Sequence, residues 1–211
     1  MGFNYWQELE EGQVYHIYNK SISSLDLFRD EDDYLHFLKI YGKYFLDYFD
    51  TYAYCLIPNH FHLLVRVKTR EEILGKLKRE NTSAAKKYLN GEIPLRLFLS
   101  DQLKRFLSSF TIRYNRKYNN SGSVFVRKLK RIKVSAVGTI QHLLCYIHHN
   151  PIHHGLVNSY GQWKYSSYSS YLKNVNTNIA KYDMLNWLGG IDVFKELHTS
   201  FRNNRIVENI E

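Results

Sequence analysis

The chain of 211 residues has only two cysteines, Cys55 and Cys145, and no CxxC pair. This excludes a zinc site built from cysteines. Because both residues lie in apolar runs, we expect buried free thiols and a cytoplasmic protein. No apolar run reaches the roughly 18 residues of a transmembrane helix. The opening MGFNYWQELEEG lacks a basic region followed by an apolar one, so we expect no signal peptide.

Acidic residues are missing from one long segment. Between Lys104 and Lys133 the sequence has ten Lys or Arg and no Asp or Glu, whereas the whole chain has a net charge of +9. Positive charge concentrated in this way favours an acidic partner, most simply nucleic acid. The chain also has 18 tyrosines. Aromatic faces among basic residues suit stacking on unpaired bases, although most of these tyrosines are expected to be ordinary core and surface residues.

Several catalytic signatures are absent as well. The sequence has no GxxxxGK[ST], GxSxG or HExxH motif, so no nucleotide-driven step is indicated. The acidic pairs Asp32-Asp33 and Glu71-Glu72 fall at expected helix starts, where the helix dipole explains them. They are therefore weak candidates for a two-metal carboxylate nuclease.

The order of the expected elements predicts an α+β fold, with helices packed on an antiparallel sheet. Strands are expected at 12–22, 50–57, 60–67 and 121–135, the middle two forming a hairpin. Helices are expected at 29–49, 70–81, 100–120 and 137–150, with two short ones within 183–201. The segment 81–98 is expected to be mainly a connection.

Three positions are expected to set helix ends. Asp30 or Asp32 should cap the helix at 29–49, and Ser100 should cap the helix at 100–120. Pro151 should end the helix that begins at Val137, because the residue before a proline is disfavoured in the α region.

The stretch CLIPNHFHLLVRV, residues 55–67, carries two histidines in an apolar strand. Strand alternation sends His60 and His62 to one face, while Phe61, Leu63 and Val65 point into a core. Two neutral imidazoles on one strand face can bind one divalent metal. The alternative is that both are surface histidines or hydrogen-bonded core histidines.

The stretch CYIHHNPIHHGLV, residues 145–157, carries a second group of candidates. Tyr146 and Asn150 are four residues apart and share one helix face. A phenol can attack phosphorus, but with a reference pKa of about 10 it needs a nearby cation or metal. The alternative for Tyr146 is a structural role. The group formed by His148, His149, His153 and His154 is expected to be a solvated helix end, with a histidine-rich metal tract as the other interpretation.

Taken together, PNHFHLLV, YIHHNPIHHGLV and WKYSSY resemble the motifs of the HUH single-tyrosine transposases, and most of all those of the REP-associated tyrosine transposases. The resemblance runs from about residue 12 to residue 172. It implies a ferredoxin-like (RRM-like) palm, with the two histidines on a central strand and a helix carrying the tyrosine across them. Residues 1–175 would form this domain, and 176–211 would be a C-terminal helical extension.

The resemblance also implies roles for the four site residues. His60 and His62 would be metal ligands and Tyr146 the nucleophile. Asn150 stands where the family has a third polar ligand, often a glutamine in the insertion-sequence relatives, and asparagine has the shorter reach. The metal would be Mg²⁺ or Mn²⁺, and imidazole ligands favour Mn²⁺ somewhat over Mg²⁺.

The implied activity is cleavage and rejoining of single-stranded DNA beside a hairpin, through a 5′-phosphotyrosyl intermediate. Family relatives occur as monomers and as dimers. A basic set would position the DNA backbone: Lys104, Arg105, Arg113, Arg116, Arg127, Lys128, Lys130, Arg131 and Lys133. Two alternatives stay open at this point. One is a non-catalytic module that binds structured nucleic acid, and the other is a domesticated relative that cleaves DNA but mobilises nothing.

Overall fold

The sheet at the centre of the molecule has four antiparallel strands. The computed structural model describes residues 7–23, 25–78, 82–126, 128–173 and 176–203. The strands are β1 (Val14–Lys20), β2 (Phe49–Ile57), β3 (His60–Val67) and β4 (Lys130–Val134), in the spatial order β2-β3-β1-β4. β3 is therefore a central strand, and the predicted α+β fold with its β2–β3 hairpin is confirmed.

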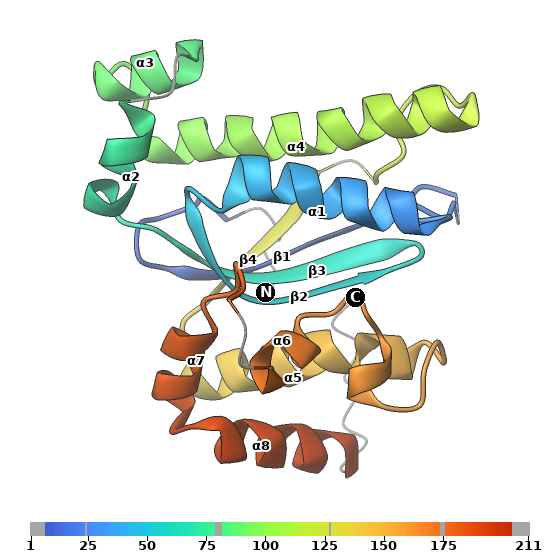
Figure 1. Cartoon of the computed structure of the whole chain (residues 1–211). Helices are drawn as coiled ribbons and strands as arrows, with labels where there is room; N and C mark the ends of the chain where they lie inside the picture. The colour runs from blue at the N-terminus through green and yellow to red at the C-terminus, as the bar shows by residue number, and fades with distance from the viewer. Residues whose placement is uncertain (1–6, 24, 79–81, 127, 174–175, 204–211) are drawn as a thin grey trace, which may run out of the picture.

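Helices cover both faces of this sheet (Figure 1). One face carries α1 (Glu31–Phe45) and α4 (Leu95–Tyr118), and α2 (Arg70–Leu77) and α3 (Ser83–Leu89) lead into α4. The other face carries α5 (Val137–His153), followed by η1 (Tyr160–Gln162), α6 (Tyr168–Leu172), α7 (Lys181–Leu188) and α8 (Ile191–Asn203). Within the described residues, no helix combines the length and the apolar character needed to cross a membrane.

Each face of the sheet builds its own apolar cluster. Phe61, Leu63 and Val65 pack with the buried side chains of α1 and α4. Leu64 points the other way, to a cluster that includes side chains of α5, α7 and α8. Strand alternation therefore works as predicted, and it sends His60 and His62 to the α5 side.

Two predictions about the α4 region were wrong. Ser100 does not cap a helix, because α4 begins nearly two turns earlier, after Pro94 in extended conformation, and the Ser100 hydroxyl accepts from Arg131 instead. The segment 81–98 is not mainly a connection, since it contains α3, whose first turn is capped by the Thr82 side chain. A threonine cap at the start and Gly91 after the end were the signals available in the sequence.

Two further boundaries differ from the prediction. α5 continues through Pro151 to His153, because the turn after the proline is closed by the backbone bonds from His154 to Asn150 and from Gly155 to Ile152. Among the described residues of the strand predicted over 121–135, Lys130–Val134 is ladder-paired, and Phe125 forms an isolated bridge with Ser21. The first helix is capped by Asp30, as one of the two alternatives proposed.

Candidate active site

The structure brings the four predicted site residues together between β3 and α5. His60 and His62 lie on the β3 face that α5 covers, and Tyr146 and Asn150 lie one turn apart on α5. All four are buried, with exposed fractions of 7%, 1%, 3% and 0% in that order. The two histidines share one face of β3 because side chains alternate along a strand, and Tyr146 and Asn150 share one face of α5 because a helix turns every 3.6 residues. The packing of α5 on the sheet brings the two faces together.

The ring of His60 is held from both sides. Its Nδ1 lies 2.8 Å from Asn59 Oδ1, and because that oxygen can only accept, Nδ1 carries the proton. In the neutral ring, Nε2 then presents a lone pair, 3.0 Å from Asn150 Oδ1, which is also an acceptor. Turning the Asn150 amide over would make this contact an ordinary hydrogen bond. A cation between the two atoms is the other way to satisfy both.

The ring of His62 is held by a histidine that the sequence analysis did not select. His62 Nδ1 lies 2.9 Å from Nε2 of His16 on β1. When His62 donates in this bond, its Nε2 carries a lone pair, and that atom is buried with no hydrogen-bond partner among the described residues. Only the pairing of β1 with β3, which sets Tyr18 opposite His62, reveals that His16 is a neighbour.

Burial keeps these imidazoles neutral. Desolvation, together with the neighbouring His16, His60 and His154, holds the pKa of His62 well below its ordinary value. Desolvation also lowers the pKa of His16 to about 3. A neutral imidazole with an unused lone pair is the form that binds a metal.

Tyr146 lies behind the His62 ring rather than in open space. Its ring meets the His62 ring edge to face at 5.5 Å between centroids, and the His16 ring at 6.4 Å. With 3% of its surface exposed, Tyr146 is shielded by the sheet and by the helices that cover α5.

A small pocket of about 80 Å³ opens beside the histidines. It is lined by Tyr18, Asn19, Lys20, His60, His62, Val126 and Lys130, and Tyr146 is not part of the lining. Tyr18 stacks with the His62 ring at 5.5 Å, and the Lys130 ammonium lies 5.0 Å from the centre of the Tyr18 ring. An aromatic face and a cation beside the two histidines suit a nucleotide.

The other histidines of the 145–157 stretch do not form one tract. The His154 ring lies 4.9 Å from that of His60, at the edge of the site. His148 instead points into the C-terminal helices, where it contacts His198 and Ser167 at 2.8 and 2.7 Å. His148 is buried, so the prediction of a wholly solvated helix end is wrong for this residue.

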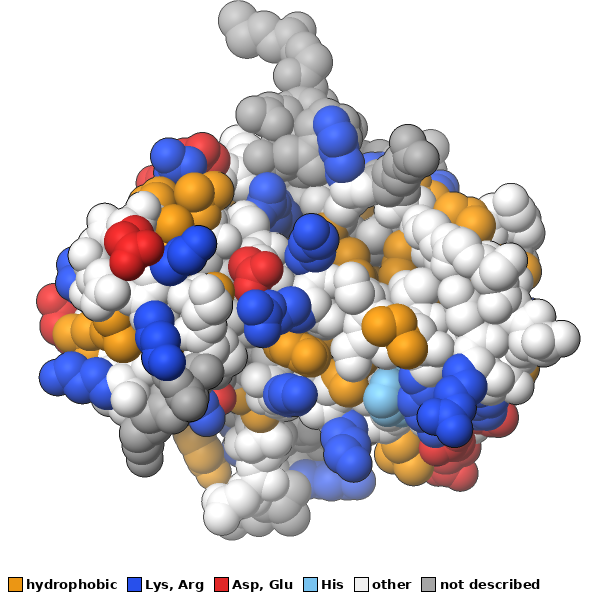
Figure 2. All heavy atoms as spheres, turned by 90° about the horizontal axis from the view of Figure 1, so that it is seen from above, with side chains coloured by type: hydrophobic (Ala, Val, Ile, Leu, Met, Phe, Trp, Pro, Cys, Tyr) orange, Lys and Arg blue, Asp and Glu red, His pale blue; other side chains and the backbone are white. Residues whose placement is uncertain are grey.

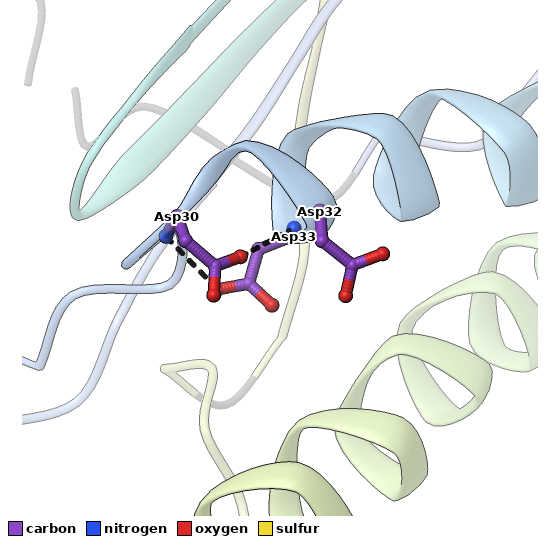
Figure 3. Close-up of side chains that lie close together, drawn as sticks. All are labelled: Asp30, Asp32 and Asp33. Atoms are coloured by element: carbon purple, nitrogen blue, oxygen red, sulfur yellow. Dashed lines mark hydrogen bonds between the residues drawn. The ribbon is translucent and has the colours of Figure 1, made fainter.

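Three aspartates at the start of α1 form the one group of three or more His, Cys, Asp or Glu in the described chain whose ligand atoms all lie close enough together for a metal (Figure 3). The Lys117 ammonium already lies 2.7, 3.1 and 2.9 Å from oxygens of Asp30, Asp32 and Asp33. Asp30 and Asp33 also form the capping box of α1. Lys117 and Arg113 offset part of the negative charge, and the place of the group at the start of α1 agrees with the helix-dipole explanation.

The structure spreads the predicted DNA-binding residues over several surfaces. Arg105, Arg113 and Lys133 form ion pairs with Asp101, Asp32 and Glu10. Lys104, Lys128 and Arg131 line one groove, Lys130 lines the histidine pocket, and Arg116 is exposed on α4. Arg127 lies outside the described residues.

Comparison with known proteins supports the resemblance. No family model matches the chain. A REP-associated tyrosine transposase of Haemophilus influenzae is 27% identical over 123 residues, which cover 57% of this chain and 59% of that protein. A solved structure of a REP-associated tyrosine transposase bound to a REP hairpin superposes with a TM-score of 0.52, at 13% identity, over 84% of this chain and 90% of the other. The chain is therefore similar to REP-associated tyrosine transposases in part of its sequence and in its fold.

The two similarities carry different weight. The structural match shares the fold, including the antiparallel sheet with helices on it. The sequence match spans less than two thirds of the Haemophilus influenzae transposase, so the activity of that whole protein is an inference for this chain. The hairpin in the solved structure belongs to that transposase.

Proposed function

We propose that this chain is a metal-dependent transposase that cleaves and rejoins single-stranded DNA near hairpins, with Tyr146 as the nucleophile. The observation that carries the proposal is the buried Nε2 of His62, which has no hydrogen-bond partner in the described part of the chain. A buried polar atom without a partner costs free energy, so it marks a place where a ligand completes the structure.

The donor set fits Mg²⁺ or Mn²⁺. His60 Nε2 and Asn150 Oδ1 are 3.0 Å apart. An imidazole nitrogen and an amide oxygen are donors that such ions accept, and two donors this close together could hold the same ion. His60, His62 and Asn150 would hold the ion, which when bound would polarise the scissile phosphate and offset the charge that builds on its oxygens.

The chain's own residues supply the transfer. The Tyr146 oxygen loses its proton and forms a bond to phosphorus, and the bond between phosphorus and the 3′ oxygen breaks. The 3′ oxygen takes up a proton, which leaves a free 3′-OH and a 5′-phosphotyrosyl link. One phosphodiester replaces another, so rejoining by the reverse reaction requires no nucleotide, in agreement with the missing GxxxxGK[ST] motif.

The burial of Tyr146 adds a requirement. Because its ring is 3% exposed and lies outside the pocket lining, a phosphate in the pocket meets the hydroxyl only after Tyr146 changes rotamer or α5 shifts. His16 would act on the reaction indirectly, since it fixes the orientation of His62 through their shared hydrogen bond.

The test is covalent capture of DNA. Protein incubated with hairpin-bearing single-stranded DNA and Mn²⁺ is expected to form an adduct that survives a denaturing gel, and chelation of the metal should abolish it. Tyr146→Phe should form no adduct, whereas Tyr168→Phe, a change of the same size on the same side of the sheet, should form it normally. Adduct formation by Tyr146→Phe at the wild-type level would show that the nucleophile is assigned wrongly.

A second pair of variants separates the metal role from folding. His62→Gln is expected to lose the adduct and to keep hairpin binding. The control is His142→Gln, which changes a histidine of α5 that contacts Phe201 of α8, and it should keep both. Hairpin binding by the wild type without cleavage, across a set of hairpins, would instead favour the non-catalytic binding module.

A further inference from the structure

A groove of about 930 Å³ runs between α4 and the segment 123–131. Its apolar wall includes Leu107, Phe125 and Leu129, and Ile112, at 70% exposure, lies at its border. Figure 2 views the molecule from the α4 side and shows lysine and arginine side chains spread among apolar ones over this face. A cavity of this volume is at the upper end of those that bind a ligand, and it exceeds what one base would fill.

The groove adjoins the candidate active site. Val126 lines both the groove and the histidine pocket, so the two adjoin at this residue. The backbone carbonyl of Val126 accepts from the side chain of Asn19, another pocket residue, at 3.2 Å. A DNA strand that leaves the histidine pocket over Val126 would therefore enter the groove.

The charge of the groove suits a polyanion. Lys104, Lys128 and Arg131 line it, and none of its lining residues in the described chain is acidic. The Arg131 guanidinium donates from Nη1 to Ser100 Oγ at 2.9 Å, while its Nε is buried without a hydrogen-bond partner among the described residues. Desolvation lowers the pKa of Arg131, and the nearby Tyr15 and Glu8 offset only part of that shift. A phosphate oxygen would satisfy this group.

We infer that the groove binds unpaired nucleotides of the DNA strand next to the scissile phosphate, with bases on its apolar wall and phosphates at Lys104, Lys128 and Arg131. This inference rests on the proposed function, because it assumes that DNA occupies the histidine pocket. The inference separates the basic residues of the 104–133 segment into those that contact the DNA strand and those that form ion pairs on the protein surface.

Arg105 provides a matched control for Lys104. The two residues are neighbours on α4 and both are exposed, but Arg105 is paired with Asp101 at 2.6 Å and does not line the groove. Replacement of either residue by glutamine removes one positive charge from the protein. A difference between the two variants therefore reports position and not net charge.

The first experiment measures binding without cleavage. The full chain, in buffer with a chelator, is titrated against a labelled hairpin with a tail of about ten thymidines on the 5′ side, on the 3′ side or on neither. One tail is expected to tighten binding about tenfold or more, since each stacked base contributes appreciably. Equal affinities for all three probes would overturn the inference.

The variants then test which residues produce the gain. Lys104→Gln and Arg131→Gln should lose most of the tail's contribution and lower the slope of log affinity against log salt by about 0.7 per lost contact. Arg105→Gln should keep the gain and the slope. Equal losses in Lys104→Gln and Arg105→Gln would show that general charge, and not this groove, binds the tail.

A crosslink places the tail directly. Ser108 is exposed and lines the groove, and the native cysteines Cys55 and Cys145 are buried, so Ser108→Cys introduces one accessible thiol there. A thiol-modified tail should form a disulfide with Ser108→Cys and not with Arg105→Cys. Crosslinking to both at equal rates would contradict a defined path.

The two proposals fail in different ways. If the wild type forms no covalent adduct but the tail gain depends on Lys104 and Arg131, the groove binds DNA and the cleavage assignment is wrong. If the wild type forms the adduct and no probe shows a tail gain, cleavage stands and the groove inference is overturned.

Discussion

The two faces of the sheet are packed by different chemistry. On the α1 and α4 side, Phe37, Phe61 and Phe106 meet one another with ring centroids 4.9 to 6.3 Å apart, and the buried polar side chains of these two helices are Asp33 and Gln102. On the α5 side, the apolar cluster shares its space with buried histidines, Ser167 and Asn150. One face is built for stability, and the other gives up apolar contacts to hold polar groups at defined positions.

Because burial keeps His148 and His198 neutral, the hydrogen bonds between them on the α5 side have one consistent arrangement of protons. His198 Nδ1 donates to the Phe194 carbonyl at 2.7 Å, so its Nε2 accepts from Nδ1 of His148. His148 Nε2 then accepts from the Ser167 hydroxyl. This chain of bonds ties α8 to the helix that carries Tyr146.

The largest effect is expected from the apolar face. Phe106→Ala removes a fully buried ring and should lower the free energy of unfolding by about 3–5 kcal/mol. Denaturant unfolding followed by circular dichroism measures this loss, and Ile112→Ala on the exposed side of α4 is the control. A loss below that of Ile112→Ala would show that this face does not dominate stability.

A smaller and more local effect is expected from the histidine chain. His198→Ala leaves the buried His148 Nδ1 proton without its acceptor and should cost about 1–3 kcal/mol. Hydrogen exchange should accelerate mainly in α5 and α8, because the sheet and α1 keep their contacts. Uniform acceleration through β1, β3 and α1 would mean that the two faces open as one unit.

Acid should weaken the same face. Burial lowers the pKa of His198 to about 4 and holds that of His148 well below its ordinary value. The unfolded chain therefore binds protons first as the pH falls below about 6.5, and each such group costs roughly 1.4 kcal/mol per pH unit until its folded pKa is reached. The midpoint temperature of thermal unfolding should decrease as the pH is lowered from 7 to 5. The decrease should be smaller in His198→Phe. An equal fall in the variant would assign the pH dependence to other groups.

The smallest effect is expected on the outer surface of α4. Arg105→Ala breaks an exposed ion pair with Asp101 one helical turn away and should change stability by about 0.3–0.5 kcal/mol. Added salt should reduce the difference from the wild type in thermal unfolding. A loss of more than about 1 kcal/mol would mean that Arg105 supports more than this pair.

Most of the candidate site could be predicted because its spacings are local. Alternation along β3 separates His60 and His62 from Phe61, and one helical turn joins Tyr146 to Asn150. The same local patterns predicted the Asp30 cap and the two helices of the C-terminal segment. Helix limits that depend on packing, such as the start of α4, were predicted less well.

Tertiary structure decided the partners of these residues. His16 meets His62 only because β1 pairs with β3 in a register that residue order does not encode locally. His198 reaches His148 across 50 positions of the chain, once α8 docks on α5. The basic residues of 104–133 look alike in sequence, yet packing pairs Arg105 with Asp101 and sets Lys104 in a groove. The sequence by itself determined which side chains share a face, since the periods of strands and helices follow from local backbone geometry. Long-range strand pairing and helix packing determined which residues that face contacts.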